Sequence, residues 1–460
     1  MASPFLKPGL RVLTLLLLLL HFPYLAHAIP LQDTNTPRLL HRQNPIPPDL
    51  DPFYSAPANL NASSPGDILR YRPVPYPIAA FTTTIVNLTA AFQIQYRTTD
   101  STGNPEAAVT TLLIPHNAHP AKLLSYQMAE DSAYQSCAPS FALQTSSAQN
   151  ASISIELAFI EAALNKGWYV VVPDFEGPKS AYLAGAQAGF ATLDSVRAVL
   201  QSTAFSNISH APRTALWGYS GGAFASNWAL ELQASYAPEL RFVGAATGGT
   251  INNIAGAFTA INNGLLAGLI PTSFLGLAAA YPDFSAALEQ ELVPETAATF
   301  KTVLTQCSSE DYSEFAGQDI LSYFKTGAAF LNTSIVQTTL NKVNIGKHVP
   351  VTPLYIYKAI NDEVSPIADT DAFVDYYCAG GADVEYRRDL LSGHITLAIT
   401  GAGEALAWLD DRMAGVAVRC GCNTTNVVST LLDPVGVLAL GDIVAGVLIG
   451  YLAGVVQSSK

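Results

Sequence analysis

Beyond about residue 69 the chain alternates between short apolar runs and segments with the apolar spacing of a helix. The strand-like runs are 123–127, 168–172 and 214–217, and the helix-like segments are 153–165 and 186–200. Strands that alternate with helices predict a mostly parallel sheet, because each parallel pair needs a crossover connection that a helix usually supplies. We therefore expect an α/β fold with a central sheet flanked by helices.

The pattern changes between residues 252 and 347, where helix-like segments are broken by Gly and Pro and lack clear strand patterns. Strand-like runs resume at 351–360 and 384–387. This interruption predicts a helical cap, residues 252–347, inserted into one domain. The core domain then comprises residues 69–251 and 348–422.

The N-terminal region differs from the core. Lys7 and Arg11 precede an apolar run that ends in Ala26-His27-Ala28, a pattern typical of a signal peptide that is removed after residue 28. Residues 29–68 are rich in Pro, Asn, Asp and Ser, which predicts an extended arm without regular structure.

The C-terminal tail, residues 423–460, is apolar. Its 22 residues from 435 to 456 are long enough to span a bilayer. However, Asp442 lies near the start of this stretch and no basic cluster flanks it. We expect an apolar helix that packs on the domain, with a membrane span or a removed lipid-anchor tail as the alternative.

Composition narrows the class of partner. Hydrophobic residues make up 49% of the chain and charged residues 13%, which excludes a disordered chain. The net charge of −13 would repel nucleic acid, so uncharged substrates are expected. A secreted, extracellular glycoprotein fits the six sequons, which are Asn61, Asn87, Asn150, Asn207, Asn332 and Asn423.

The five cysteines are an odd number for a chain that enters an oxidising compartment, so two disulfides and one free thiol are expected. Cys420 and Cys422 are too close in sequence to form a zinc site without further ligands nearby. We predict no structural metal and no cofactor.

A candidate nucleophile lies in the pentapeptide Gly218-Tyr219-Ser220-Gly221-Gly222. It follows the strand-like run 214–217 directly and precedes a helix-compatible segment. In this context Ser220 occupies the sharp turn between a strand and a helix, where flanking glycines avoid a collision. The alternative interpretation is an ordinary glycine-rich turn.

A serine hydroxyl needs a base, and in this fold class the chain order is serine, acid, histidine. Of the eight histidines, only His348 and His394 come after Ser220 in the chain, as this order requires. His348 precedes the strand-like run 351–360 and leaves no later strand end for the acid. His394 follows a predicted strand and is therefore the predicted base.

The orienting acid is expected at the end of a strand between the serine and the histidine. Asp362 follows the strand-like run 351–360 directly. This position favours Asp362 over the acidic neighbours Glu363, Asp369, Asp371 and Asp383.

Several ordered segments carry a family resemblance: Ser125-Tyr126-Gln127, Glu130-Asp131-Ser132, Cys137-Ala138-Pro139-Ser140, Asp174-Phe175-Glu176-Gly177, Gly218-Tyr219-Ser220-Gly221-Gly222-Ala223, Tyr236-Ala237-Pro238-Glu239-Leu240, Asp362-Glu363 and His394. With them the chain resembles the fungal secretory lipase family, of the Candida antarctica lipase A type, over most of residues 65–425. The resemblance implies an α/β-hydrolase sheet, a helical cap (lid) over the site, and hydrolysis of acylglycerol esters.

The resemblance also implies roles that spacing does not reveal. Asp131 and the backbone amide of Gly221 would be the oxyanion donors. One disulfide would join Cys137 to Cys307, and another would join Cys378 to a cysteine near the C-terminal end. Cys420 and Cys422 compete for that second pairing, and Cys422 is slightly favoured.

The sequence therefore predicts a secreted triacylglycerol lipase that uses Ser220, His394 and Asp362 at a lipid–water interface. We expect a lipid ester as substrate, and neither nucleic acid nor an obligate protein partner. Alternatives are a secreted carboxylesterase, peptidase or acyltransferase of the same fold, and a catalytically inactive cell-surface binding protein. The intact order of serine, acid and histidine argues against the inactive protein.

Overall fold

The computed structural model describes residues 44–80, 84–144 and 151–441, which belong to one compact unit of the chain. The predicted signal peptide and most of the apolar stretch 435–456 lie outside the described residues. Within the described part of the chain, every helix is too short or too polar to cross a membrane.

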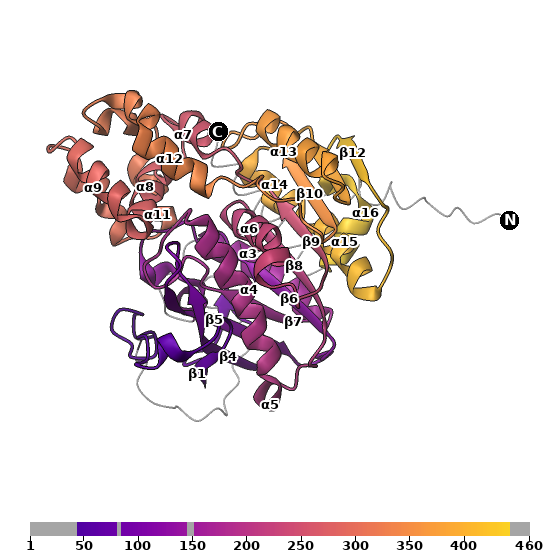
Figure 1. Cartoon of the computed structure of the whole chain (residues 1–460). Helices are drawn as coiled ribbons and strands as arrows, with labels where there is room; N and C mark the ends of the chain where they lie inside the picture. Colours follow the sequence, from indigo (N-terminus) through magenta and orange to yellow (C-terminus); the bar gives the residue numbers. More distant parts are fainter. Residues whose placement is uncertain (1–43, 81–83, 145–150, 442–460) are drawn as a thin grey trace, which may run out of the picture. The chain divides into compact units, whose positions relative to one another are not determined.

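A ten-stranded sheet organises this unit, with the strand order β1-β4-β5-β7-β6-β8-β9-β10-β11-β12 (Figure 1). Its strands are β1 (Ile68–Pro73), β4 (Leu88–Thr99), β5 (Pro105–Pro115), β6 (Lys122–Gln127), β7 (Tyr169–Pro173), β8 (Arg213–Tyr219), β9 (Phe242–Gly248), β10 (Leu354–Ala359), β11 (Val384–Asp389) and β12 (Cys422–Val427). A separate small sheet pairs β2 (Ala79–Ala80) with β3 (Thr84–Ile85).

Most of the sheet is parallel, which confirms the predicted fold class. The pairs β1–β4, β4–β5 and β5–β7 are antiparallel. Every pair from β7–β6 onward to β11–β12 is parallel. The carboxyl ends of the parallel strands therefore meet at one edge, where ligand sites of open α/β sheets are found.

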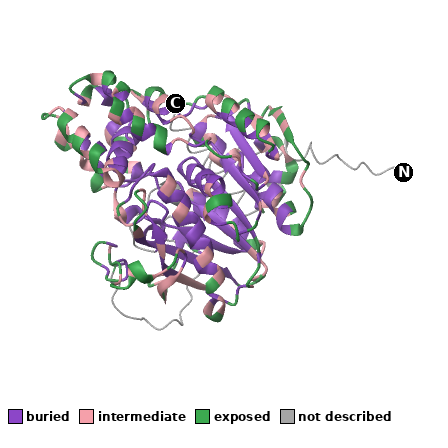
Figure 2. Ribbon diagram, in the orientation of Figure 1, coloured by how far each residue is buried: buried purple, intermediate pink, exposed green. Residues whose placement is uncertain are grey.

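Neighbouring residues of the central strands pack on opposite faces of the sheet. Leu123 and Leu216 join the core on one face, whereas Leu124 and Trp217 join the core on the other. Helices α4 (Gly185–Gln201), α6 (Gly221–Tyr236) and α13 (Ile367–Ala379) cover the first face, and α3 (Ala151–Asn165), α14 (His394–Thr400) and α15 (Ala402–Ala414) cover the second. Figure 2 shows the buried strands between helices whose outer surfaces are exposed.

The segment between β9 and β10, for which the sequence predicts a helical cap, folds as a group of helices. They are α7 (Ile254–Ile261), α8 (Leu269–Ala280), α9 (Pro282–Glu291), α10 (Ala297–Phe300), η3 (Thr302–Leu304), α11 (Ser308–Phe315), η4 (Ile320–Tyr323), η5 (Gly327–Asn332) and α12 (Ser334–Val343). In Figure 1, α8, α9, α11 and α12 lie together. Phe274 lies at the centre of their aromatic core, where its ring contacts Phe284, Phe324 and Phe330.

The remaining helices are short. They are η1 (Leu60–Ala62), η2 (Gln135–Cys137), α2 (Pro139–Ala142), α5 (Thr203–Ser206), η6 (Thr430–Leu432) and α16 (Pro434–Leu440). From residue 44 onward the predicted arm follows the core closely, because Phe53 and Tyr54 pack with Val109 of β5.

The structure corrects the boundary that the sequence places after residue 422. β12 begins at Cys422 and pairs with β11 as far as Val427, so residues 423–427 belong to the sheet and not to an apolar tail. The strand has the sequence Cys-Asn-Thr-Thr-Asn-Val and alternates between exposed and half-buried positions. An edge strand of this kind lacks the continuous apolar run that marks a strand buried on both faces.

Candidate active site

Ser220 lies at the turn between β8 and α6. Its φ of 52° is in the left-handed region, which is unusual for a residue with a side chain and is typical of a strained functional turn. A Cβ added to Gly218 would overlap the carbonyl of Gly222, and a Cβ added to Gly222 would overlap the carbonyl of Gln127. The flanking glycines are therefore required by space, as the pentapeptide predicts.

The structure brings Ser220, His394 and Asp362 into one chain of hydrogen bonds. His394 Nε2 lies 2.8 Å from Ser220 Oγ, and His394 Nδ1 lies 2.8 Å from Asp362 Oδ2. The second carboxylate oxygen of Asp362 accepts the backbone N–H groups of Val364 and Ser365. Asp362 is thus held in place to orient the imidazole toward the serine.

The competing acidic residues have other partners. Asp371 pairs with Arg388, and Asp383 accepts the backbone N–H of Gly421. Glu363 does reach the site, but it accepts the backbone N–H of His394 at 2.7 Å and not the ring nitrogen.

The alternative histidine, His348, is not a member of this hydrogen-bond chain. The backbone N–H of His348 donates to Glu231 Oε2, at the end of the cap.

Two further residues support the histidine and its acid, and sequence reasoning did not find them. The hydroxyl of Tyr219 donates to the carbonyl oxygen of His394 at 2.5 Å. Lys358 Nζ lies 2.9 Å from Asp362 Oδ2, and neither side chain is exposed. The sequence did offer one signal for Lys358, since it is a lysine inside the otherwise apolar strand Leu354–Ala359. Because an unpaired cation is rarely buried, such a lysine indicates an acidic partner nearby.

Asp131 is buried beside the nucleophile. A Cβ added to Gly221 would overlap its Oδ1 atom, which places this carboxyl group over the first residue of α6. Burial raises the pKa of Asp131 to about 6, although the charge of His394 and a hydrogen bond from Tyr182 act in the opposite direction. In its neutral form the carboxyl can donate a hydrogen bond, next to the amide of Gly221 in the first turn of the helix.

Asp131 belongs to a set of buried carboxyl groups that we call the acid cluster, Glu130, Asp131, Glu156, Asp174 and Glu176. Burial raises the pKa of Asp174 to about 7 and that of Glu156 to about 8. Burial and neighbouring carboxylates also raise the pKa values of Glu130 and Glu176. The salt bridges among the described residues all involve other carboxylates.

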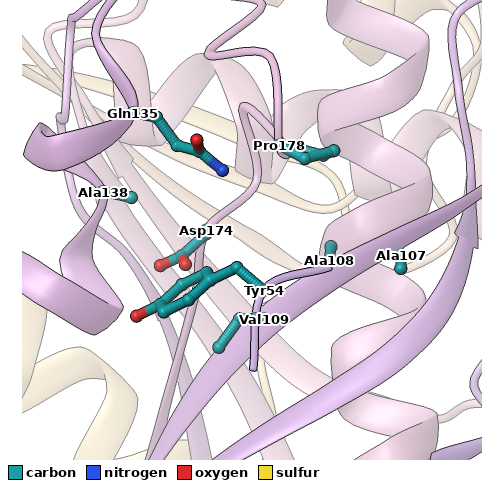
Figure 3. Close-up of a pocket in the computed structure, with 9 residues that line it drawn as sticks. Tyr54, Ala107, Ala108, Val109, Gln135, Ala138, Asp174 and Pro178 are labelled. Atoms are coloured by element: carbon teal, nitrogen blue, oxygen red, sulfur yellow. The ribbon is translucent and has the colours of Figure 1, made fainter. Parts of the chain in front are cut away.

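Asp174 connects the acid cluster to the N-terminal arm. Figure 3 shows its carboxyl group beside the ring of Tyr54, with Gln135 and Ala138 nearby. Asp174 accepts the backbone N–H of Ser140 at 2.8 Å, and the hydroxyl groups of Ser140 and Tyr54 lie 2.9 Å apart. These hydrogen bonds fix the segment that follows Asp131.

A cavity of about 290 Å³ opens onto the serine and the histidine. Its polar lining includes Asp131, Ser220 and His394. Its apolar lining comes from α3, the cap and α14, and includes Ile155, Phe159, Leu266, Leu269, Ile395 and Ile399. The cavity is suited to an uncharged chain that ends at a carbonyl group beside Ser220.

The disulfides agree with the family resemblance, which left Cys420 and Cys422 open as partners of Cys378 and slightly favoured Cys422. Cys137 is bonded to Cys307, which ties the segment after Asp131 to the cap, and Cys378 is bonded to Cys422. Cys420 is free and exposed. Among the residues with described positions, we find no group of three His, Cys, Asp or Glu side chains that could hold a metal ion.

Ser220 lies at a strand–helix turn, and its histidine and acid follow later strands of a mostly parallel sheet. This arrangement defines the α/β-hydrolase class. Together with the structural similarity to a lipase, it identifies the protein as a carboxylic ester hydrolase. The chain belongs to the secretory lipase family, whose model matches residues 143–420.

Similar proteins agree with this membership. The chain is 44% identical to Lipase A of Arthroderma benhamiae, over 86% of this chain and 86% of that protein. It is 41% identical to trichothecene C-3 esterase of Fusarium sporotrichioides, over 80% of this chain and 84% of that protein. The crystal structure of Candida antarctica lipase A in its closed state superposes with a TM-score of 0.80 at 30% identity, covering 88% of this chain and 96% of that one.

Proposed function

We propose that the chain is a secreted lipase that hydrolyses acylglycerol esters through an acyl-enzyme on Ser220. The observation that carries the proposal is the hydrogen-bond chain from Asp362 through His394 to Ser220, at the wall of a largely apolar cavity. An uncharged acyl chain fits this lining, whereas a charged peptide terminus would lose its hydration there.

In the proposed mechanism, His394 Nε2 takes the proton of Ser220 as the hydroxyl attacks the ester carbonyl. The oxyanion that forms is stabilised by the backbone amide of Gly221 and, below the Asp131 pKa of about 6, by the neutral carboxyl of Asp131. His394 then gives the proton to the alcohol that leaves. Water releases the acyl group, and another alcohol can replace water because the acyl-enzyme accepts either hydroxyl.

Exposed apolar side chains near His394 support a lipid–water interface as the working surface. Leu391 and Ile395 flank the histidine, and α14 packs against η6, where Leu432 is exposed. Val435 and Leu438 continue this apolar surface on α16, which packs next to η6. Contiguous exposed apolar surface of this kind is typical of a contact with lipid or with another protein.

Secretion is supported by the two disulfides, because such bonds persist in oxidising compartments. The predicted signal peptide, residues 1–28, is consistent with the same route. Detection of the mature protein in the culture medium, with residues 1–28 removed, would test this part of the proposal.

The test of the nucleophile is Ser220→Ala. It should abolish ester hydrolysis and fluorophosphonate labelling without unfolding the protein, since one oxygen is removed at a turn. His394→Ala should lower activity by a similar factor, and the double variant by little more, because triad members act as a unit. Hydrolysis by purified, folded Ser220→Ala would refute the proposal.

A secreted carboxylesterase acting on short soluble esters is the second candidate. It is favoured by the 41% identity to a protein named trichothecene C-3 esterase. A series of p-nitrophenyl esters from short to long chains, beside an emulsified triglyceride, separates the two. Activity confined to short soluble esters would replace the lipase assignment by the esterase assignment.

The cap provides a test of the acyl site. Leu269 of α8 lines the cavity, so Leu269→Trp should lower kcat/KM for long chains more than for short ones. Leu265 is 77% exposed and does not line the cavity, so Leu265→Trp is the matched control. An unchanged ratio of long-chain to short-chain kcat/KM in folded Leu269→Trp would place the acyl chain elsewhere.

A further inference from the structure

Lys358 is a buried cation next to the proposed catalytic acid. It belongs to β10, four residues before Asp362, and both side chains have no exposed surface. Its Nζ lies 2.9 Å from Asp362 Oδ2 and donates to the carbonyl oxygen of Thr250 at 3.2 Å. The ammonium group is therefore held between the end of β9 and the acid.

Asp362 Oδ2 is shared by two donors. His394 Nδ1 lies 2.8 Å from this oxygen and Lys358 Nζ lies 2.9 Å from it. The other oxygen, Oδ1, accepts two backbone N–H groups. A serine–histidine–aspartate site needs only the histidine contact, so the lysine adds a charge that the ordinary mechanism does not include.

A contribution to the stability of the fold does not by itself explain the buried ion pair of Lys358 and Asp362. Taking a lysine and an aspartate out of water costs several kcal/mol per ion, and well-packed apolar residues often replace buried pairs without loss. Burial lowers the pKa of Lys358, and the charge of Asp362 acts in the opposite direction. This cation is kept at a cost in free energy, and it contacts the same carboxylate oxygen as the histidine. It is therefore placed to influence whether the imidazole carries a proton.

We propose that Lys358 is a positioning residue that offsets the charge of Asp362 and so keeps His394 in its neutral, proton-accepting form at mildly acidic pH. This inference rests on the proposed function. A lone buried carboxylate strongly favours the imidazolium form, in which the histidine is no longer a base. A positive charge on the same oxygen reduces that preference and also opposes a second positive charge nearby.

Other titratable groups around the pair act against the lysine. Glu363 accepts the backbone N–H of His394, and Asp131 interacts with the histidine charge. Asp369 of α13 and Glu363 also act on Lys358. Tyr219 of β8 contacts the carbonyl oxygen of His394 through its hydroxyl. Carboxylates around the pair favour the imidazolium form that Lys358 disfavours, and Asp131 does so only above its pKa of about 6. Tyr219 adds no charge, because burial raises the pKa of its phenol well above the usual value.

The test is the pH profile of kcat/KM for a soluble p-nitrophenyl ester with Lys358→Met and Lys358→Gln. Methionine removes the charge at a similar volume, and glutamine keeps a hydrogen-bond donor without the charge. The acidic limb should move to higher pH by about 1 unit in both variants. A charge within about 4–6 Å of a titrating group typically shifts its pKa by about 1 to 3 units, and 1 unit is the lower end of that range. The rate of fluorophosphonate labelling should show the same shift, because it reports the same base.

Two controls separate this effect from a general loss of stability. Lys166 pairs with Asp410 at the same 2.9 Å, but its side chain is 21% exposed and remote from the triad, so Lys166→Met should leave the acidic limb in place. Lys358→Arg keeps the charge and should preserve the parent limb. Circular dichroism and thermal unfolding show whether each variant is folded.

An acidic limb that stays in place in folded Lys358→Met and Lys358→Gln would overturn the inference, whatever the loss in kcat. Failure of all three Lys358 variants to fold would also overturn it, since the lysine would then serve stability. Neither outcome touches the proposed function, which fails if Ser220→Ala remains active or if activity is confined to short soluble esters.

Discussion

Two carboxyl groups of the site, Asp362 and Asp131, are both buried but have opposite surroundings. Burial alone would raise the pKa of Asp362, yet the charges of His394 and Lys358 hold it below its usual range. Burial raises the pKa of Asp131 to about 6, because His394 and Tyr182 offset only part of that effect. Charged partners, and not depth, decide which carboxyl group keeps its charge.

The difference matches two separate tasks. A charged carboxylate at Asp362 orients and stabilises the histidine, whereas a neutral carboxyl at Asp131 can donate a hydrogen bond to an oxyanion. A carboxylate at the second position would instead repel the developing negative charge. Environments that push two pKa values apart are a common way to assign roles to acids in one site.

The largest effect is expected for Asp362→Asn. An amide at this position donates to the ring nitrogen and favours the wrong imidazole tautomer, so kcat should fall by about 10⁴. Asp371→Asn is the control, because Asp371 pairs with Arg388 away from the triad and should keep parent activity. A kcat within tenfold of the parent for Asp362→Asn would show that the charge of Asp362 is not needed to orient and stabilise the histidine.

Asp131 provides the next test. Asp131→Ala removes a donor to the oxyanion and should lower kcat by about 10² to 10³ with little change in KM. Asp131→Asn keeps an N–H donor that does not titrate, so its kcat relative to the parent should rise as the pH increases through about 6, the pKa of Asp131. An unaltered kcat in Asp131→Ala would show that this side chain does not contact the oxyanion.

The acid cluster predicts that stability declines as pH rises. The pKa of Glu156 is raised from 4.5 to about 8, so the folded chain holds a proton that the unfolded chain has lost between these values. Stability is then complete below pH 4.5 and decreases up to about pH 8, by about 1.4 kcal/mol for each unit of pKa difference. Asp362, with its lowered pKa, has the opposite sign and acts only in the acidic range.

Thermal unfolding between pH 5 and 8 would measure this decline. Glu156→Gln should make the decline smaller, because the amide does not titrate while the other members of the acid cluster still do. A melting temperature that rises steadily over this range in the parent would show that the cluster is charged in the folded protein.

The smallest effect is expected for Asp174→Asn. Burial raises the pKa of Asp174 to about 7, so at pH 5 its carboxyl is already neutral in the folded chain. Replacement by an amide of the same shape should change the free energy of unfolding by about 1 kcal/mol or less at that pH. Urea unfolding measures the change. A much larger loss would mean that Asp174 is ionised, like Asp362.

Local patterns predicted much of the fold and the site. Strand-like runs located β6, β7, β8, β10 and β11, and the clearest of them, β7, is continuously apolar because it is buried along its whole length. The antiparallel strands β4 and β5 were missed, because Gln, Thr and Arg interrupt the apolar positions of β4 and two Thr residues interrupt those of β5. The edge strand β12 was missed for the same reason.

The sequence by itself determined the nucleophile turn and the order of serine, acid and histidine, because these depend on neighbouring residues and on connectivity along one chain. Only the tertiary structure placed Ser220 within 2.8 Å of a histidine 174 residues away. It also paired Lys358 with Asp362, whereas Asp131 takes part in none of the salt bridges among the described residues. A pKa depends on burial and on charges in space, and a linear sequence specifies neither until the sheet and the cap have packed.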